Sequence, residues 1–297
     1  MKRNILVLIL VLGASCQSSK TTKEIDLHKT EARLSEGFKS YWFDGTAEIS
    51  SFDLEQSRYG SIRKGEAVLI FVSEDFLTQN QVKANSKSNS SKVVLKLNKQ
   101  KNFLTGIYPY SIMSSSFTYL GWEPHLAKIS NSIQEWCGQS YLQLNHKNPM
   151  ELRSHSYFEG EEDQLIHFPM NTLTEDELWN RIRLQPENLP IGEFTLLPSL
   201  ELLRLNHLAL ETVSVSAALK PGDSLSTYEI SFPSFGRKLS IHFQKEPPYL
   251  IEAWEDKSDK GAAFTTKAYR RKTVKLPYWK LNKTGDEQYR TNLNLTL

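Results

Sequence analysis

The stretch TVSVSAALKPGDSLSTYEISFPSFGRKLSIHFQ, residues 212–244, decides the fold class of this chain. Apolar and polar side chains alternate from Val213 to Leu219, and the same two-residue period returns in residues 228–232 and 239–243. Successive side chains of a strand point to opposite faces, so this period is typical of strands with one buried and one wet face. Pro-Gly-Asp and Pro-Ser-Phe-Gly separate the three segments and predict turns. We therefore expect a meander of antiparallel strands.

Strand patterns extend outward from this meander in both directions. The apolar runs 67–72 and 93–97 predict buried strands, and residues 249–254 predict another strand after the Pro247-Pro248 turn. Helix signals are concentrated in residues 174–183, where Thr174 precedes Glu177 at the spacing of a capping box. Residues 124–130 form a much weaker helical pattern. The expected fold is mainly β, with antiparallel curved sheets or half-barrels and one connecting helix near 174–183.

The same patterns divide the chain into segments. We expect the helix to connect either two sheets or two halves of one curved sheet. The predicted segments are a signal peptide (1–15), a tether (16–36), an N-terminal β half (37–165), a helical connector (166–190), a C-terminal β half (191–283) and a tail (284–297).

The first sixteen residues predict export and lipidation. Lys2 and Arg3 precede an apolar run over residues 5–12, which has the order of a secretory signal and is too short to span a bilayer. Small residues then lead to Cys16, in an arrangement similar to a bacterial lipobox, although Gly13 stands where a Leu is usual. We expect a lipid on Cys16 that anchors the protein to the membrane. The alternative is a secreted protein cut just before Cys16.

The segment after Cys16 bears on location. It is polar and lacks apolar periodicity, which predicts a tether. Surface-exposed Bacteroidota lipoproteins tend to carry acidic residues directly after the cysteine, and residues 17–20 have none. We therefore expect a lipid-anchored protein of the cell envelope, in the outer membrane and facing the periplasm.

Composition limits the classes of function. The formal net charge is only +2, which does not suggest a nucleic-acid partner. A lipid on Cys16 would leave Cys137, the second of two cysteines, without a disulfide partner. The chain has no phosphate-binding loop, nucleophile elbow or zinc-protease motif, and its seven histidines stand singly. We expect no cofactor and no metal.

The densest group of polar and aromatic residues lies in residues 133–159. We read this segment as one hairpin, with arms 133–144 and 151–159, in which Cys137 opposes Tyr157 and Gln139 opposes His155. One face would then carry a candidate binding patch, and the other would carry Trp136, Leu142, Leu144 and Phe158 as core. The patch residues are Glu135, Cys137, Gln139, His155, Tyr157 and Glu159. The alternative is the wet face of an ordinary sheet.

Two further segments suggest surface roles. Asp223-Ser224-Leu225 resembles the site of O-glycans on exported Bacteroidota proteins, which makes Ser224 a candidate acceptor. Residues 267–283 carry seven Lys or Arg and no acidic residue. Such a strip suits contact with anionic headgroups, and it equally suits an edge strand guarded by lysines.

Several segments resemble an uncharacterised family of Bacteroidota lipoproteins. They are YGSIRKGEA (59–67), TGIYPYSIM (105–113), QEWCG (134–138), SHSYFEG (154–160) and EDELW (175–179). Members are often labelled "septum formation inhibitor Maf". True Maf proteins are cytoplasmic nucleotide pyrophosphatases of α/β fold with an N-terminal Ser-Pro-Arg-Arg motif, which is not found here. The resemblance therefore implies an envelope location and no mechanism.

Two functions follow as hypotheses. The first is a non-enzymatic envelope protein that binds a hydrophobic, glycan or protein ligand on a concave sheet, as periplasmic half-barrels that carry lipids do. The second is a periplasmic hydrolase that uses Glu135, His155 and Glu159.

Overall fold

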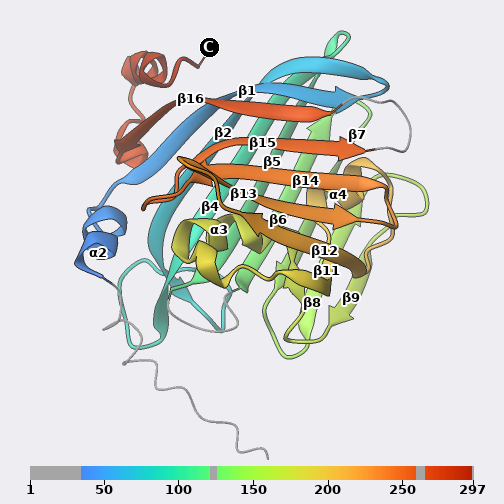
Figure 1. Cartoon of the computed structure of the whole chain (residues 1–297), viewed down its shortest axis with the longest axis horizontal. Helices are drawn as coiled ribbons and strands as arrows, with labels where there is room; N and C mark the ends of the chain where they lie inside the picture. Colours follow the sequence, from blue (N-terminus) through green and yellow to red (C-terminus); the bar gives the residue numbers. More distant parts are fainter. Residues whose placement is uncertain (1–34, 121–125, 259–264, 296–297) are drawn as a thin grey trace, which may run out of the picture.

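The computed structural model describes residues 35–120, 126–258 and 265–295. The predicted signal peptide, Cys16 and nearly all of the predicted tether lie outside the described residues. Within them, the strands form one 16-stranded sheet that is antiparallel except for one short parallel pair. The expected mainly β fold with a curved antiparallel sheet is confirmed, and Figure 1 shows the sheet with its few short helices.

The elements follow one another along the chain in simple order. They are α2 (Glu36–Trp42), β1 (Ala47–Arg58), β2 (Ser61–Leu77), β3 (Val82–Lys83), β4 (Ser91–Thr105), β5 (Tyr108–Tyr119), β6 (Leu126–Glu135), β7 (Gly138–Asn145), β8 (Met150–Ser156), β9 (Gln164–Phe168), β10 (Leu173–Thr174), α3 (Glu175–Leu184), η1 (Pro186–Asn188), β11 (Gly192–Leu197), α4 (Leu200–Leu205), β12 (Val213–Lys220), β13 (Leu225–Phe232), β14 (Arg237–Gln244), β15 (Ile251–Ser258), β16 (Thr266–Leu276), η2 (Tyr278–Lys280) and η3 (Asp286–Leu293).

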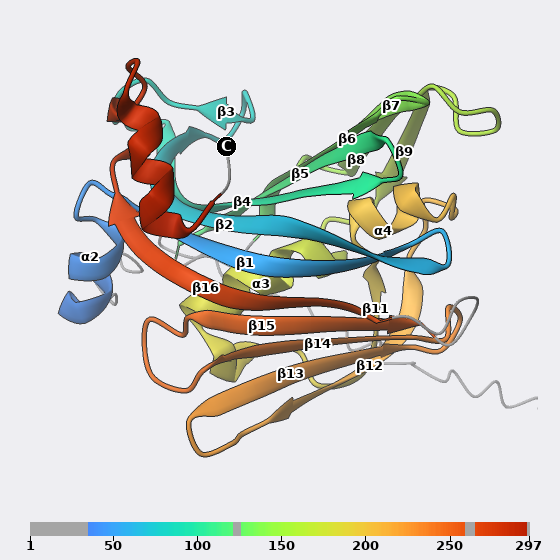
Figure 2. The same cartoon turned by 90° about the horizontal axis from the view of Figure 1, so that it is seen from above.

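The sheet is continuous because β16 pairs with β1. Its order is β10-β11-β12-β13-β14-β15-β16-β1-β2-β4-β5-β6-β7-β8-β9, with β3 paired to β2 beside this path. The two strands at its ends, β9 and β10, are separated by only residues 169–172, so the chain holds the ends within about 20 Å of each other. Figure 2 shows the resulting curvature, with α3 and α4 between the two arms of the sheet. The two predicted β halves are therefore halves of one curved sheet.

The predicted meander corresponds to β12, β13, β14 and β15. Tyr228 and Ile230 of β13 are buried opposite Ile241 and Leu239 of β14, and both pairs belong to the main core. The predicted strands 67–72 and 93–97 lie within β2 and β4. Alternation thus identified these strands because one face of each is dry.

The predicted helix corresponds to α3. Thr174 Oγ accepts a hydrogen bond from the backbone N–H of Glu177, as the capping pattern predicted, and the helix ends just before Pro186. Most of its side chains are buried in the concave face of the sheet, including charged ones. Asn180 anchors it there by donating to the carbonyl oxygens of Leu95 and Ser116. The helix is therefore part of the core as well as a connection.

Two expectations about local structure were wrong. Residues 126–130 belong to strand β6 and not to a helix, because their side chains pair across β5 and β7. Residues 124 and 125 lie outside the described residues. The basic strip follows β16, which is an interior strand paired on both sides, so it does not guard a sheet edge. Carboxylates of neighbouring strands pair with Arg270 and Arg271 of this strip.

The predicted tail also packs on the body. Helix η3 places Leu293 against Ile49 and Val68 on the outer face of β1 and β2. Ser51 donates a hydrogen bond to the Leu293 carbonyl oxygen. In the part of the chain that the structure describes, no helix combines the length and the apolar character needed to cross a bilayer.

Candidate functional site

A cavity of about 570 Å³ opens at one end of the curved sheet. Its walls come from the end of β1, the middle of β4, the starts of α3 and α4, the β13–β14 turn and the facing ends of β15 and β16. Helix α2 precedes the other end of β1, so the cavity and α2 lie at opposite ends of the molecule (Figure 2). The volume is in the range of pockets that bind small molecules.

One wall carries a buried cluster of two lysines and a glutamate. Lys101 Nζ lies 2.7 Å from Glu201 Oε1, and Lys99 Nζ lies 3.6 Å from Glu201 Oε2 and 4.8 Å above the Trp179 ring. Burial would raise the pKa of Glu201, but the two ammonium groups outweigh it and lower that pKa to about 2. Glu201 is therefore an ionised hydrogen-bond acceptor at neutral pH and does not serve as a general acid.

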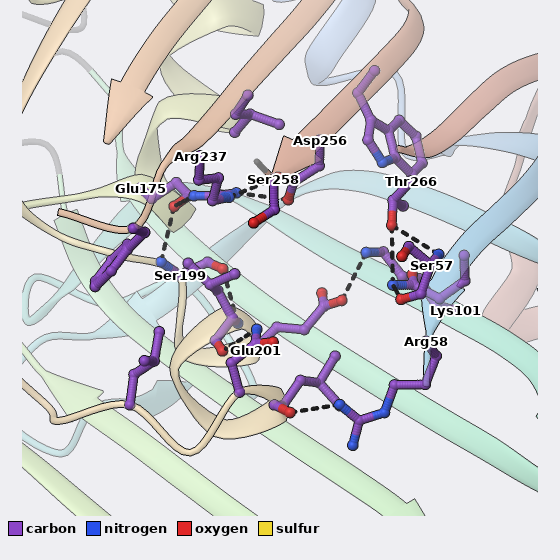
Figure 3. A pocket seen from close by; sticks show the side chains of 18 of the residues that line it. Ser57, Arg58, Lys101, Glu175, Ser199, Glu201, Arg237, Asp256, Ser258 and Thr266 are labelled. Atoms are coloured by element: carbon purple, nitrogen blue, oxygen red, sulfur yellow. Dashed lines mark hydrogen bonds and ion pairs between the residues drawn. The ribbon is translucent and has the colours of Figure 1, made fainter. Parts of the chain in front are cut away.

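The second charged cluster centres on Arg237. Its guanidinium donates two hydrogen bonds to Glu175, at 2.7 and 2.8 Å, and two to Asp256, at 2.7 and 2.8 Å. Burial opposes ionisation of Glu175, but Arg237 holds the pKa of that carboxyl below its usual range. Figure 3 shows this cluster in the cavity, apart from the contact between Lys101 and Glu201. Both clusters are internally neutralised or nearly so, and together they offer donors and acceptors with little net charge.

Aromatic side chains surround the opening of the cavity. Tyr59 has a φ of +52°, which is uncommon for a non-glycine residue, and its side chain is 58% exposed. Its hydroxyl lies 2.8 Å from that of Tyr110, and the Arg58 guanidinium lies 4.4 Å from its ring centroid. The ring of Phe235, in the β13–β14 turn, is half-buried at the opposite side. These rings provide flat apolar surfaces beside the polar walls.

The predicted binding patch lies near this cavity but has a different geometry from the one expected. The chain reverses at Trp136 and Cys137, so the expected first arm is in fact two strands, β6 and β7. Cys137 is therefore in a turn, and Trp136 is 68% exposed rather than part of the core. Leu142 and Leu144 are buried, as expected.

The register of the return arm differs by two residues from the expected one. His155 faces Tyr141, and the Tyr157 N–H donates to the Gln139 carbonyl oxygen. Cys137 lies four residues from Tyr141, about 13 Å along the strand, so its thiol is out of hydrogen-bonding reach of His155. The register shift arises because the turn removes two residues from the expected arm.

Five of the six patch residues nevertheless line one open depression, which we call the hairpin depression. Glu135, Cys137, Gln139, His155 and Tyr157 line it, and Glu159 does not. His155 Nδ1 lies 3.1 Å from Asp163, and Glu135 accepts a hydrogen bond from the Cys137 N–H. Glu135, His155 and Glu159 thus do not converge on one enclosed point as the hydrolase hypothesis requires.

The cavity residues were missed from the sequence, although a signal for some of them exists. Residues 95, 97, 99, 101 and 103 share one face of β4, where Lys99 and Lys101 interrupt an otherwise apolar series. Two lysines on a buried face predict buried carboxylate partners. Nothing in the sequence pattern identifies Glu201 or Arg237 as those partners or neighbours, because they come from distant segments.

The remaining sites concern the surface and metals. Ser224 lies exposed in the β12–β13 turn, which makes it accessible to modification. Among the described residues, no group of three or more His, Cys, Asp or Glu side chains is arranged to hold a metal ion.

Comparisons with known proteins bear on the fold. No protein-family model and no curated protein matches the chain. A solved structure similar to it is the crystal structure of the beta-barrel-like protein of domain of unknown function DUF1849 from Brucella abortus, with a TM-score of 0.44 and 8% identity over 77% of this chain and 97% of that chain. At this identity the similarity concerns the fold alone.

Proposed function

We propose that this protein is a non-enzymatic binding protein of the bacterial cell envelope that takes up a hydroxyl-rich ligand, such as an oligosaccharide, in the cavity at the end of the sheet. The single observation that carries the proposal is the 570 Å³ cavity whose charged walls are already paired. A binding site needs such preformed donors and acceptors, whereas a hydrolase needs a proton donor poised near neutral pH.

The chemistry of the walls favours a neutral polar ligand over a lipid chain. An acyl chain would cover Lys101, Glu201 and Arg237 with hydrocarbon, and it would remove water from charged groups without replacing its hydrogen bonds. Sugar hydroxyls can donate to the carboxylates and accept from the cations without breaking either ion pair. The C–H faces of sugar rings can pack on Tyr59 and Phe235.

The proposed location depends on the sequence. Lys2, Arg3, the apolar run and Cys16 favour export and lipid attachment, and the residues after Cys16 favour the periplasmic face of the outer membrane. The resemblance to the Bacteroidota lipoprotein family supports the same location. A tether of about 20 residues could reach some 60 Å, enough to hold the body clear of the bilayer.

The test is mass spectrometry of molecules that co-purify with the native, full-length protein. We expect an oligosaccharide with the wild type and its loss with Asn206→Trp, which places a large ring on the exposed rim of the cavity. The matched control is Glu193→Trp, an exposed position on β11 away from the cavity, which should retain the oligosaccharide.

Three results would count against the proposal. A phospholipid or fatty acid in place of the oligosaccharide would overturn the choice of ligand. Equal recovery from the wild type and Asn206→Trp would overturn the choice of cavity. Recovery of no ligand from any of the three proteins would overturn the binding function.

A further inference from the structure

A small crevice connects the cavity to the hairpin depression. It has a volume of about 40 Å³, enough for a group of a few heavy atoms. Arg58, Tyr59 and Leu205 line both the crevice and the cavity. Glu135, Gly138 and Ser140 line both the crevice and the hairpin depression. The three spaces therefore form one path along the end of the sheet.

Two arginines meet in this crevice, and each has an unused buried donor. Within the described residues, the Nε–H groups of Arg58 and Arg204 are buried and have no acceptor. Arg204 has a side chain only 6% exposed, and its guanidinium lies 4.2 Å from the Phe158 ring centroid. Leaving a buried donor unsatisfied costs about 1–3 kcal/mol, so two in one crevice indicate a missing acceptor. Arg63 and Arg181 also have a buried Nε–H without an acceptor, but neither lines the crevice.

The other atoms of these arginines are already engaged and hold them in place. Arg58 donates through Nη1 to the Leu205 carbonyl oxygen and through Nη2 to the hydroxyls of Tyr59 and Tyr110. Arg204 Nη1 lies 2.5 Å from Glu161 Oε2, and Glu161 Oε1 lies 2.6 Å from His207 Nδ1. These contacts restrict both guanidinium groups before any ligand arrives.

The carboxylates that face the crevice do not supply the missing acceptor. Glu161 is occupied by Arg204 and His207, and Glu135 accepts from the Cys137 N–H. Burial lowers the pKa of Arg204, and the nearby positive charge of Arg58 lowers it further, while Glu161 acts in the opposite direction. An added anion would relieve both effects on Arg204.

We propose that Arg58 and Arg204 form a subsite for a carboxylate group, and that the ligand of the cavity is therefore an acidic glycan bearing a uronic-acid type residue. This inference rests on the proposed function for the glycan, but the anion subsite itself does not depend on it. The two Nε–H groups donate to the carboxylate oxygens, and the rest of the chain extends into the cavity on one side and the hairpin depression on the other. A planar carboxylate suits the small crevice and the directional guanidinium donors.

The experiment observes the arginine Nε–H signals of the full-length protein by NMR during titration with sodium acetate at constant ionic strength, set with sodium chloride. Arg58→Lys and Arg204→Lys each remove one signal and so assign it. We expect both signals to shift in a saturable way. Arg153 is an internal control, because its exposed Nε already lies 2.8 Å from Glu151 and its signal should not follow the same curve.

A second titration compares glucuronate with glucose and with inorganic phosphate. We expect glucuronate to bind at least tenfold more tightly than glucose, and Arg204→Lys or Arg58→Lys to remove that advantage. Nε–H signals that do not respond to acetate would overturn the subsite and indicate that water alone fills the crevice. A stronger response to phosphate than to glucuronate would overturn the assignment to a carboxylate.

The two proposals can fail separately. If the arginine signals respond to acetate but no oligosaccharide co-purifies, the anion subsite stands, while the glycan function and the acidic-glycan assignment fall. If a neutral oligosaccharide co-purifies and the arginine signals are silent, the cavity function stands and the subsite falls.

Discussion

Arg183 on α3 and Glu48 on β1 form a fully buried, two-pronged ion pair, with Nη1–Oε1 and Nη2–Oε2 distances of 2.5 and 2.6 Å. Tyr41 of α2 donates a third hydrogen bond to the same carboxylate, and Arg183 Nε donates to the Pro248 carbonyl oxygen. The pair thus joins the N-terminal helix, the central helix and the first strand at the end of the molecule opposite the cavity.

The first prediction concerns this pair. Arg183→Ala should lower the free energy of unfolding by about 3–5 kcal/mol, because it leaves the Glu48 charge buried without its partner. Replacing both residues with apolar ones, Arg183→Met with Glu48→Leu, should recover much of that loss. Urea unfolding followed by tryptophan fluorescence measures both. A double variant no more stable than Arg183→Ala would show that the hydrogen bonds from Tyr41 and to Pro248 dominate.

The second prediction concerns Asp176 and pH. Burial raises the pKa of this carboxyl from 3.8 to about 6, despite the opposing charge of Lys99. A carboxyl whose pKa is higher in the folded state favours folding as it is protonated, so its contribution to stability grows as pH falls from about 6 toward 4. This group should add about 1 kcal/mol between pH 7 and pH 5.

The difference in unfolding free energy between the wild type and Asp176→Asn measures that contribution. It should shift in favour of the wild type by about 1 kcal/mol when the pH is lowered from 7 to 5. Asp223→Asn, at an exposed turn position, is the control and should show no such shift. Below about pH 4.5 the trend should reverse, because protonation of Glu201 removes its pairing with Lys101. A pH-independent difference would place an ordinary carboxyl at position 176.

The third prediction compares two glycines with close neighbours. A Cβ at Gly65 would lie 2.2 Å from the Asn102 carbonyl oxygen, which belongs to the paired strand β4 and cannot move aside. A Cβ at Gly138 would meet the Tyr157 ring at 2.9 Å, and that side chain is exposed and can rotate. Gly65→Ala should cost about 3 kcal/mol and Gly138→Ala less than about 1 kcal/mol. Thermal unfolding of the two variants gives the comparison, and equal losses would contradict it.

The fourth prediction tests the anchor. Cys16→Ser removes the thiol that receives the lipid, so the product should be uncleaved or soluble, and the mature lipidated form should disappear. Partition between detergent and aqueous phases, with Cys137→Ser as the matched control, measures this. Unchanged partition of Cys16→Ser would rule out lipidation at this residue.

The fifth prediction concerns the hairpin depression. The side chains of His155 and Tyr157 are 55% and 77% exposed, so His155→Ala and Tyr157→Ala should each change stability by no more than about 1 kcal/mol. If the ligand extends from the crevice into this depression, both variants should weaken binding of the co-purified oligosaccharide. Severe loss of stability in both variants would assign the two residues to the core.

Sequence and tertiary structure decided different parts of this protein. The sequence by itself was sufficient for the β class, the meander of β12–β15 and the capped helix α3, because alternation and capping depend on neighbours a few residues apart. It also placed Leu142 and Leu144 in the core.

Only the tertiary structure decided the site. Lys101 and Glu201 are 100 residues apart in the chain, and Arg237 and Glu175 are 62 apart, so no local pattern could pair them. The turn at Trp136 and Cys137 was equally hidden, because it lacks the usual Asn-Gly or Asp-Gly signal and is set by pairing of β6 with β7. Alternation shows which face of a strand is dry, but the curvature of the sheet determines which distant charges share the cavity at its end.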